Sequence, residues 1–203
     1  MLQAIGLVPQ DLALHEDLPA IANLRLFGAL YGVRGQLLEE RVAAALELVG
    51  LTDHAKTKPS VFSSGMKRRL NIACALVHDP DVLILDEPTV GIDPQSRNAI
   101  FDNLELLRAK GKAMLYTTHY IEEVERLCDR IVIMDHGKVI AADTKNGLQR
   151  MLPATAKKRL EIEGIVDDEV LALLAAKGLA IKSSTGASLE DVFLHLTGRQ
   201  LRD

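Results

Sequence analysis

The chain has 203 residues, of which 48% are hydrophobic and 26% charged, a composition typical of a folded globular protein. Its net charge of -4 argues against a general nucleic-acid-binding protein, which would present a basic face. No stretch reaches the roughly 20 apolar residues needed to span a bilayer, and the N-terminus lacks a signal peptide, so we expect a cytoplasmic protein that reaches a membrane only through a partner.

The N-terminal half predicts a short strand followed by helices. Residues 4–8 are apolar and predict the end of a strand. Helical periodicity then runs from about residue 18 to 78, where Gly50 closes the second of three predicted helices. The third helix begins at Ser63 or Ser64, since serine is a favoured N-cap.

The pattern changes after residue 80. Residues 82–85 form an uninterrupted apolar run, typical of a strand buried on both faces of a parallel sheet. A helix follows, with Asp93 as N-cap, Pro94 at the first helical position and Gly111 just past the end. The next predicted elements are a strand at 113–117, a helix at 121–128, and a hairpin with strands at 131–134 and 138–141.

From about residue 144 the alternation weakens. Strands at 160–162 and 179–182 are predicted around a helix capped by Asp167, and a last helix begins at Ser188. We interpret this region as a small α+β appendage. The earlier alternation of strands and helices predicts an α/β fold, with the all-helical block as an insertion.

Cysteines and basic runs have ordinary interpretations. Cys74 and Cys128 lie among apolar helix positions and share no metal-ligand spacing, so we expect buried, reduced thiols. The basic runs at 67–69 and 157–159 are interpreted as solvated helix faces or turns rather than polyanion sites.

Several polar residues lie where a parallel sheet places its ligands, at the carboxyl ends of strands. Asp86 and Glu87 end one strand and suit Mg²⁺ binding and activation of a water, although acidic residues often end strands simply to meet solvent. His119 follows another strand and could donate a hydrogen bond to a phosphate, although a lone histidine is more often structural. Gln10 is a potential neutral ligand for a metal or water, although a lone loop glutamine usually has no such role.

The start of the third predicted helix is a further candidate site. Ser63, Ser64 and Gly65 would expose backbone N–H groups at the positive end of the helix dipole, where anions bind. An ordinary helix cap is the competing interpretation.

Taken together, the order and spacing of these segments resemble the nucleotide-binding domain of ABC ATPases. Residues 5–10 resemble the Q-loop, and residues 62–67 resemble the LSGGQ signature in its variant ending in Met66-Lys67. Residues 81–89 resemble the Walker B motif with its catalytic glutamate. Residues 91–94 resemble the D-loop, and residues 117–119 resemble the switch-histidine loop. Residues 187–199 are similar to the C-terminal ending of ATP-binding subunits of ABC-2-type exporters, which move drugs, polysaccharides or similar cargo.

The resemblance implies an α/β, P-loop NTPase (RecA-like) core and a role for each matching residue. Glu87, His119 and Gln10 would be catalytic, and Asp86 and Gln10 would hold Mg²⁺. The residues implied to contact ATP are Ser63, Ser64, Gly65, Met66, Lys67 and Asp93.

The resemblance also implies an organisation and partners. The implied segments are the end of the Q-loop strand at 1–10, a helical signature subdomain at 11–79, a RecA-like core at 80–143 and a C-terminal appendage at 144–203. A second ATP-binding subunit would pair head to tail with this one. An ABC-2-type permease would hold it at the inner face of the cell membrane, and no nucleic acid is expected.

Three features depart from the family pattern. Phe62 replaces the usual leucine of the signature, which matters little. Ser64 replaces the first of two paired glycines, which would weaken a position that needs φ > 0 or close approach to phosphate. The phosphate-binding loop Gly-x-x-x-x-Gly-Lys-Ser/Thr is not found in the sequence. We therefore expect an N-terminally truncated, incomplete core that exposes apolar sheet edge and binds ATP weakly by itself.

Two explanations of this absence stay open, an internal start within a longer ATPase and a catalytically inactive pseudo-subunit. An ABC ATPase of DNA repair or translation is disfavoured, because it would need a long coiled-coil insertion or tandem ATPase halves.

Overall fold

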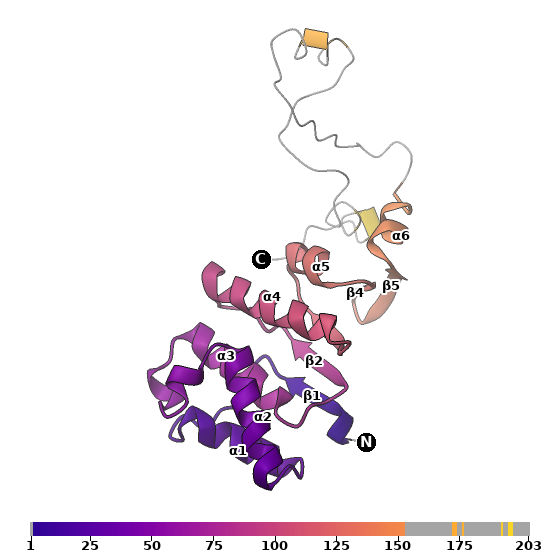
Figure 1. The fold of residues 1–203 in the computed structure, drawn as a ribbon. Coiled ribbons are helices and arrows are strands. Elements are labelled where there is room, and N and C mark those ends of the chain that lie inside the picture. The colour runs from indigo at the N-terminus through magenta and orange to yellow at the C-terminus, as the bar shows by residue number, and fades with distance from the viewer. Residues whose placement is uncertain (1, 153–171, 174–175, 177–191, 193–194, 197–203) are drawn as a thin grey trace. The chain divides into compact units, whose positions relative to one another are not determined.

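The computed structural model describes residues 2–152, 172–173, 176, 192 and 195–196 (Figure 1). Its elements, in chain order, are the short 3₁₀ helix η1 (Leu2–Ala4), β1 (Ile5–Val8), α1 (Ala20–Leu30), α2 (Gly35–Leu48), η2 (Thr52–His54), η3 (Pro59–Val61), α3 (Ser64–Leu76), β2 (Val82–Asp86), α4 (Pro94–Ala109), β3 (Ala113–Thr117), α5 (Ile121–Leu127), β4 (Ile131–Asp135), β5 (Lys138–Asp143) and α6 (Lys145–Gln149).

The predicted strands and helices up to residue 143 are confirmed, with ends shifted by one or two residues. Helix α6 was not predicted, and it is capped by Thr144, whose side chain accepts a hydrogen bond from the Gly147 amide. The elements predicted at 160–162, 179–182, after Asp167 and from Ser188 lie outside the described residues. The chain divides into two compact units, residues 1–123 and 124–203, and each is described by itself.

Three parallel strands form the sheet of the first unit, in the order β1–β2–β3. Val8 pairs with Leu85 and Asp86 pairs with Thr117, so all three strands end at the same edge of the sheet. This edge is where α/β folds bind their ligands.

One face of this sheet is buried and the other is largely open. Leu83 and Leu85 are buried, whereas Ile84 is only partly buried, so the prediction that this strand is buried on both faces is wrong. Ile84 lies in register between Leu7 and Leu115, whose exposed fractions are 54% and 58%. Apolar side chains are therefore exposed on one face of the sheet, whereas the sequence predicted exposure along an edge.

Helices α1, α2 and α3 pack on one another around a core of their own and form a compact block in Figure 1. Helical spacing of apolar residues gives each helix one buried face. The buried residues of this core are Ala20, Leu24, Val42, Ala45, Leu46, Val49, Leu51, Phe62, Leu70, Ala73, Cys74 and Val77.

Cys74 and Cys128 are not joined in a disulfide in this structure. Cys74 is buried in the helical core, where desolvation raises the pKa of its thiol, so the side chain acts as a small apolar group. Cys128 is only partly buried, so the prediction of burial holds for Cys74 alone.

In the second unit, β4 and β5 form the predicted antiparallel hairpin. His136 and Gly137 both have positive φ, 47° and 73°, which is the backbone of a tight two-residue hairpin turn. The short helix α6 packs on β5. Of the helices in the described ranges, none combines the length and apolar character needed to cross a bilayer.

Truncation of a core leucine tests the packing of the helical block. Leu24 is fully buried in α1, whereas Leu30 at the end of the same helix is 72% exposed. Leu24→Ala should lower the free energy of unfolding by about 2–5 kcal/mol, because it removes buried methyl groups and leaves a cavity. Leu30→Ala should change it by less than about 0.5 kcal/mol. Urea unfolding of both variants measures this difference, and equal losses would contradict the packing.

The pH dependence of stability tests a buried histidine. His78 is 6% exposed, its ring stacks on Tyr31 with centroids 3.7 Å apart, and its Nε2 lies 3.1 Å from the Ile5 carbonyl oxygen. Burial lowers the pKa of His78 below its ordinary value of 6.5. The unfolded chain therefore binds more protons near and below pH 6.5, so this residue makes folding less stable as pH falls through that value.

We expect the unfolding free energy of the wild type to fall more steeply from about pH 7.5 to 5.5 than that of His78→Phe, which keeps a ring against Tyr31. Urea unfolding across that range measures both slopes. Parallel pH profiles would show that His78 titrates alike in the folded and unfolded states.

Candidate nucleotide site

The predicted polar residues meet at the carboxyl edge of the β1–β2–β3 sheet. Gln10 lies two residues after β1, Asp86 and Glu87 end β2, and His119 lies two residues after β3. The parallel registers bring these three chain segments to one edge.

Thr117 joins the ends of β2 and β3. Its hydroxyl donates a hydrogen bond of 2.6 Å to Asp86 Oδ1, and the Glu87 amide donates to the Thr117 carbonyl at 3.1 Å. Glu87 has φ of 43°, in the left-handed region that non-glycine residues rarely adopt. Such strain persists only where the surrounding contacts hold it, and it is frequent at functional sites.

The Glu87 carboxylate lies against the ring of His119. His119 Nδ1 is 3.2 Å from Glu87 Oε1, and both side chains are partly exposed. The contact engages one ring nitrogen, so Nε2 is the nitrogen available to a ligand. A carboxylate beside an oriented imidazole suits activation of a water next to an anionic group.

The start of α3 is ordered by a serine cap. Ser63 Oγ accepts a hydrogen bond of 3.2 Å from the Met66 amide, so the helix begins at Ser64. Ser63 and Ser64 are exposed, whereas Gly65 is buried. Ser64 is not among the described non-glycine residues with positive φ, so replacing glycine there imposes no left-handed backbone strain.

The burial of Gly65 results from contact between α3 and the start of α4. Asp93 caps α4 by accepting a hydrogen bond of 2.9 Å from the Ser96 amide, and hydrogen bonds from Ser96 lower the pKa of Asp93. A Cβ atom on Gly65 would fall well inside van der Waals contact of Ser96 Cβ and Oγ. Glycine is therefore needed here because another helix lies directly against it.

The basic residues of α3 bind the segment that follows β1. Arg68 is 5% exposed and donates hydrogen bonds to the carbonyl oxygens of Pro9 and Gln10, at 2.9 and 2.7 Å. Lys67 pairs with Glu16 at 2.5 Å. The prediction that this basic run is a solvated face is wrong for Arg68, because the backbone carbonyls of the Q-loop segment offset the cost of its burial.

Sequence reasoning missed Arg68 as a functional candidate. A signal was present, because Arg68 shares helical spacing with Gly65, Ile72 and Ala75, which are all buried. A charged residue on a buried stripe indicates a partner supplied by another segment.

The donors at the sheet edge fit Mg²⁺. Asp86 is an exposed carboxylate and Gln10 an exposed amide, and Mg²⁺ is commonly held by one or two such oxygens together with phosphates and water. Among the described residues, no group of three or more His, Cys, Asp and Glu side chains could hold a metal by itself.

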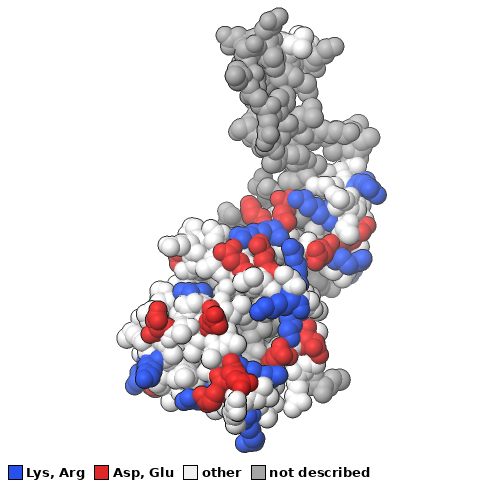
Figure 2. Space-filling view, viewed as in Figure 1, with Lys and Arg blue, Asp and Glu red and all other residues white. Residues whose placement is uncertain are grey.

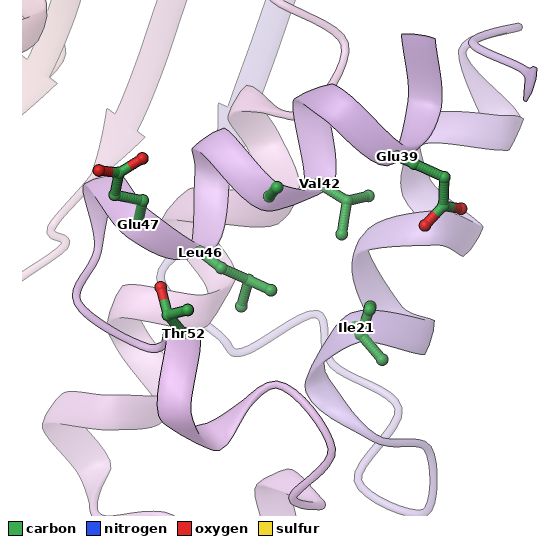
Figure 3. Close-up of a pocket in the computed structure, with 7 residues that line it drawn as sticks. Ile21, Glu39, Val42, Leu46, Glu47 and Thr52 are labelled. Carbon is green, nitrogen blue, oxygen red and sulfur yellow. The ribbon is translucent and has the colours of Figure 1, made fainter. Parts of the chain in front are cut away.

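A shallow pocket lies apart from these residues, on the helical block (Figure 3). It is lined by Ile21, Glu39, Val42, Ala43, Leu46, Glu47 and Thr52. Glu39 at its rim pairs with Arg25 at 2.6 Å.

Acidic and basic side chains are interspersed on the face of the molecule shown in Figure 2.

Comparisons with known proteins agree with this arrangement. Residues 1–90 match the family model described as ABC transporter. The linearmycin resistance ATP-binding protein LnrL of Bacillus subtilis (strain 168) is 41% identical over 99% of this chain and 76% of its own length. The chain belongs to the ATP-binding proteins of ABC transporters.

Other relatives support the same family. A Nod factor export ATP-binding protein I from Burkholderia orbicola is 40% identical over 99% of this chain and 75% of its own length. A solved structure of an ATP-binding subunit of an ABC transporter superposes with a TM-score of 0.70 at 29% identity, covering 96% of this chain and 69% of that one. The predicted P-loop NTPase type of α/β fold is thereby confirmed. ABC ATP-binding proteins use ATP with Mg²⁺, dimerise and work with membrane permeases.

A paired substitution in this ABC ATP-binding protein tests the contact between α3 and α4. Gly65→Ala should lower the free energy of unfolding by about 1–3 kcal/mol, because its methyl group overpacks against Ser96. Ser96→Gly removes the atoms that clash, so it should reduce the cost of Gly65→Ala. Urea unfolding of the two single variants and the double variant completes the cycle. Additive losses would show that the two residues do not meet.

Proposed function

We propose that this chain is the ATP-hydrolysing subunit of an ABC-2-type exporter, driving a permease that moves a drug, a polysaccharide or a similar cargo. The observation that carries the proposal is the 3.2 Å contact between His119 and Glu87 at the carboxyl edge of the sheet. Export is supported by relatives named for linearmycin resistance and for Nod factor export.

In the proposed reaction, Glu87 orients a water molecule and takes its proton as the water oxygen attacks the terminal phosphorus of ATP. The bond from that phosphorus to the bridging oxygen breaks, and ADP and phosphate leave. His119, held to Glu87 through Nδ1, directs Nε2 toward the terminal phosphate and stabilises charge there. The two side chains thus act on the water and on the phosphate from one edge.

Mg²⁺ would be held by Asp86 and Gln10, and when bound it neutralises charge on the phosphates. The hydrogen bond from the Thr117 hydroxyl to Asp86 Oδ1 orients the carboxylate, so Oδ2 is the oxygen proposed to bind Mg²⁺. This arrangement resembles the outer-shell support that orients metal-ligating carboxylates.

We propose that two subunits pair head to tail, so that the start of α3 in one subunit meets ATP bound by the other. Ser63 and Ser64 are exposed at the positive end of this 13-residue helix, which favours phosphate. Gly65, Met66 and Lys67 complete the first turn, and Asp93 lies at the start of α4, which packs against it.

In the proposed organisation, residues 11–79 contact the permease and residues 80–143 carry the reaction, with the strand end at 1–10 between them and the appendage at 144–203. Arg68 supports a link between nucleotide and permease, because it ties the Gln10 carbonyl to α3. A shift of Gln10 toward Mg²⁺ or water would pull directly on the helical block.

A second candidate is a subunit that presents its signature helix to a complete partner and hydrolyses no ATP. It is supported by the exposed start of α3 at Ser63 and Ser64, which would meet a partner's ATP without any reaction at Glu87. The two candidates differ in whether the chain binds ATP and turns it over.

Glu87→Gln in the subunit assembled with its permease tests the proposal. The substitution keeps the shape of Glu87 but removes the base, so turnover of ATP should fall by about 100-fold or more. ATP binding, measured with a fluorescent analogue, should persist. Glu122→Gln, an exposed change of the same type in α5, serves as the control and should retain wild-type turnover.

Full turnover by Glu87→Gln would remove Glu87 from the reaction. A wild-type complex in which this chain binds no ATP would instead support the non-hydrolysing subunit.

A further inference from the structure

Glu123 is a buried carboxylate in α5 that hydrogen-bonds to three hydroxyl groups. Its exposed fraction is 2%. Oε1 accepts a hydrogen bond of 2.6 Å from Thr89, and Oε2 accepts from Tyr116 at 2.9 Å and from Thr118 at 2.7 Å. Each carboxylate oxygen thus has a donor, which a buried carboxylate requires.

These hydroxyl groups belong to the two segments that carry the proposed catalytic pair. Thr89 lies two residues after Glu87, and Thr118 immediately precedes His119. Thr118 Oγ1 also accepts a hydrogen bond of 3.0 Å from the Tyr120 amide, which fixes the turn after His119. One carboxylate therefore holds the backbone on both sides of the contact between Glu87 and His119.

Arg97 extends this network to the helix that follows the D-loop. Its Nε is 3.9 Å from Glu123 Oε1, and its guanidinium lies over the Tyr120 ring, 5.2 Å from the centroid. The Tyr120 ring in turn lies against His119, with centroids 4.2 Å apart. Arg97 is in the first turns of α4, close to the cap at Asp93. Movement of that cap would reach His119 through these contacts.

If Glu123 only filled space in the fold, an apolar side chain would do so at a lower free-energy cost. Burying a charge is favourable only when it has well-placed partners. Here the partners are the threonines beside Glu87 and His119 rather than a random set of donors. The backbone of Glu87 is also strained, with φ of 43°, so its conformation depends on neighbouring segments to hold it.

We infer that Glu123 is a positioning residue for ATP hydrolysis, which couples the Walker B turn to the switch-histidine loop through Thr89 and Thr118. This inference rests on the proposed roles of Glu87 and His119. Glu123 does not touch those two side chains in the hydrogen-bond network, so it acts through the backbone that carries them.

Glu123→Gln and Thr89→Val test the coupling in the subunit assembled with its permease. An amide nitrogen in place of one carboxylate oxygen cannot accept a hydrogen bond, and valine keeps the shape of threonine without its hydroxyl. Each variant should lower kcat for ATP about 10- to 100-fold, as expected of small misplacements of catalytic groups. KM should change by less than about threefold, because neither residue is proposed to contact ATP.

Two controls separate positioning from folding. Thr89→Ser keeps the hydroxyl group that Thr89→Val removes, so its kcat should lie within about threefold of the wild-type value. Glu122→Gln makes the same chemical change at the exposed neighbouring position and should have no effect. The double variant Glu123→Gln with Thr89→Val should be little slower than either single variant, because both break the same link.

Hydrogen exchange of the chain without nucleotide gives a readout independent of ATPase activity. In Glu123→Gln, the amides of Glu87, Val90 and Tyr120 should exchange roughly tenfold faster, and amides in α2 should be unaffected. If the wild type hydrolyses no ATP, the proposed function fails while this measurement still tests the coupling. Unchanged exchange in both segments, or wild-type kcat in folded Glu123→Gln and Thr89→Val, would overturn the inference.

Discussion

The parallel pairing of β1, β2 and β3 is the constraint on which the site depends. Because the strands run in one direction, Gln10, Glu87 and His119 come to one edge although more than a hundred residues separate the first from the last. Backbone hydrogen bonds fix the register, and the bond from Thr117 to Asp86 adds a side-chain link at its end. A slip of one residue would turn each side chain of the shifted strand to the opposite face and separate Glu87 from His119.

Helix α3 connects the other parts of the first unit. It contributes to the helical core through Leu70, Ala73 and Cys74, and it holds the segment after β1 through Arg68. Its first turn lies against the start of α4 at Gly65. This one helix thus contacts α1 and α2, the segment after β1 and the start of α4. These contacts support the proposed link between nucleotide binding and a permease.

Several charged side chains of this unit join separate chain segments through hydrogen bonds to backbone carbonyls or to hydroxyl groups. Arg68 donates to two carbonyl groups, Arg69 donates to Val49 at 2.6 Å, and Glu123 accepts from three hydroxyl groups. Such bonds are stronger than those between neutral groups, and they join segments that local helix or strand bonding leaves unconnected. The loops beside the site are therefore ordered by a few buried charges rather than by apolar packing alone.

The amino-acid sequence by itself determined the order of strands and helices up to residue 143, the helix caps at Ser63 and Asp93, and the polar residues that follow each strand. These features depend on local periodicity, capping chemistry and motif spacing, which lie within short stretches of sequence. Only the tertiary structure decided that Arg68 and Glu123 are buried, that Gly65 lies beneath Ser96, and that β2 is buried on one face. The reason is that a charge can be buried only when donors or acceptors arrive from elsewhere, and the partners of Arg68 and Glu123 lie as far as 59 and 34 residues away in the chain.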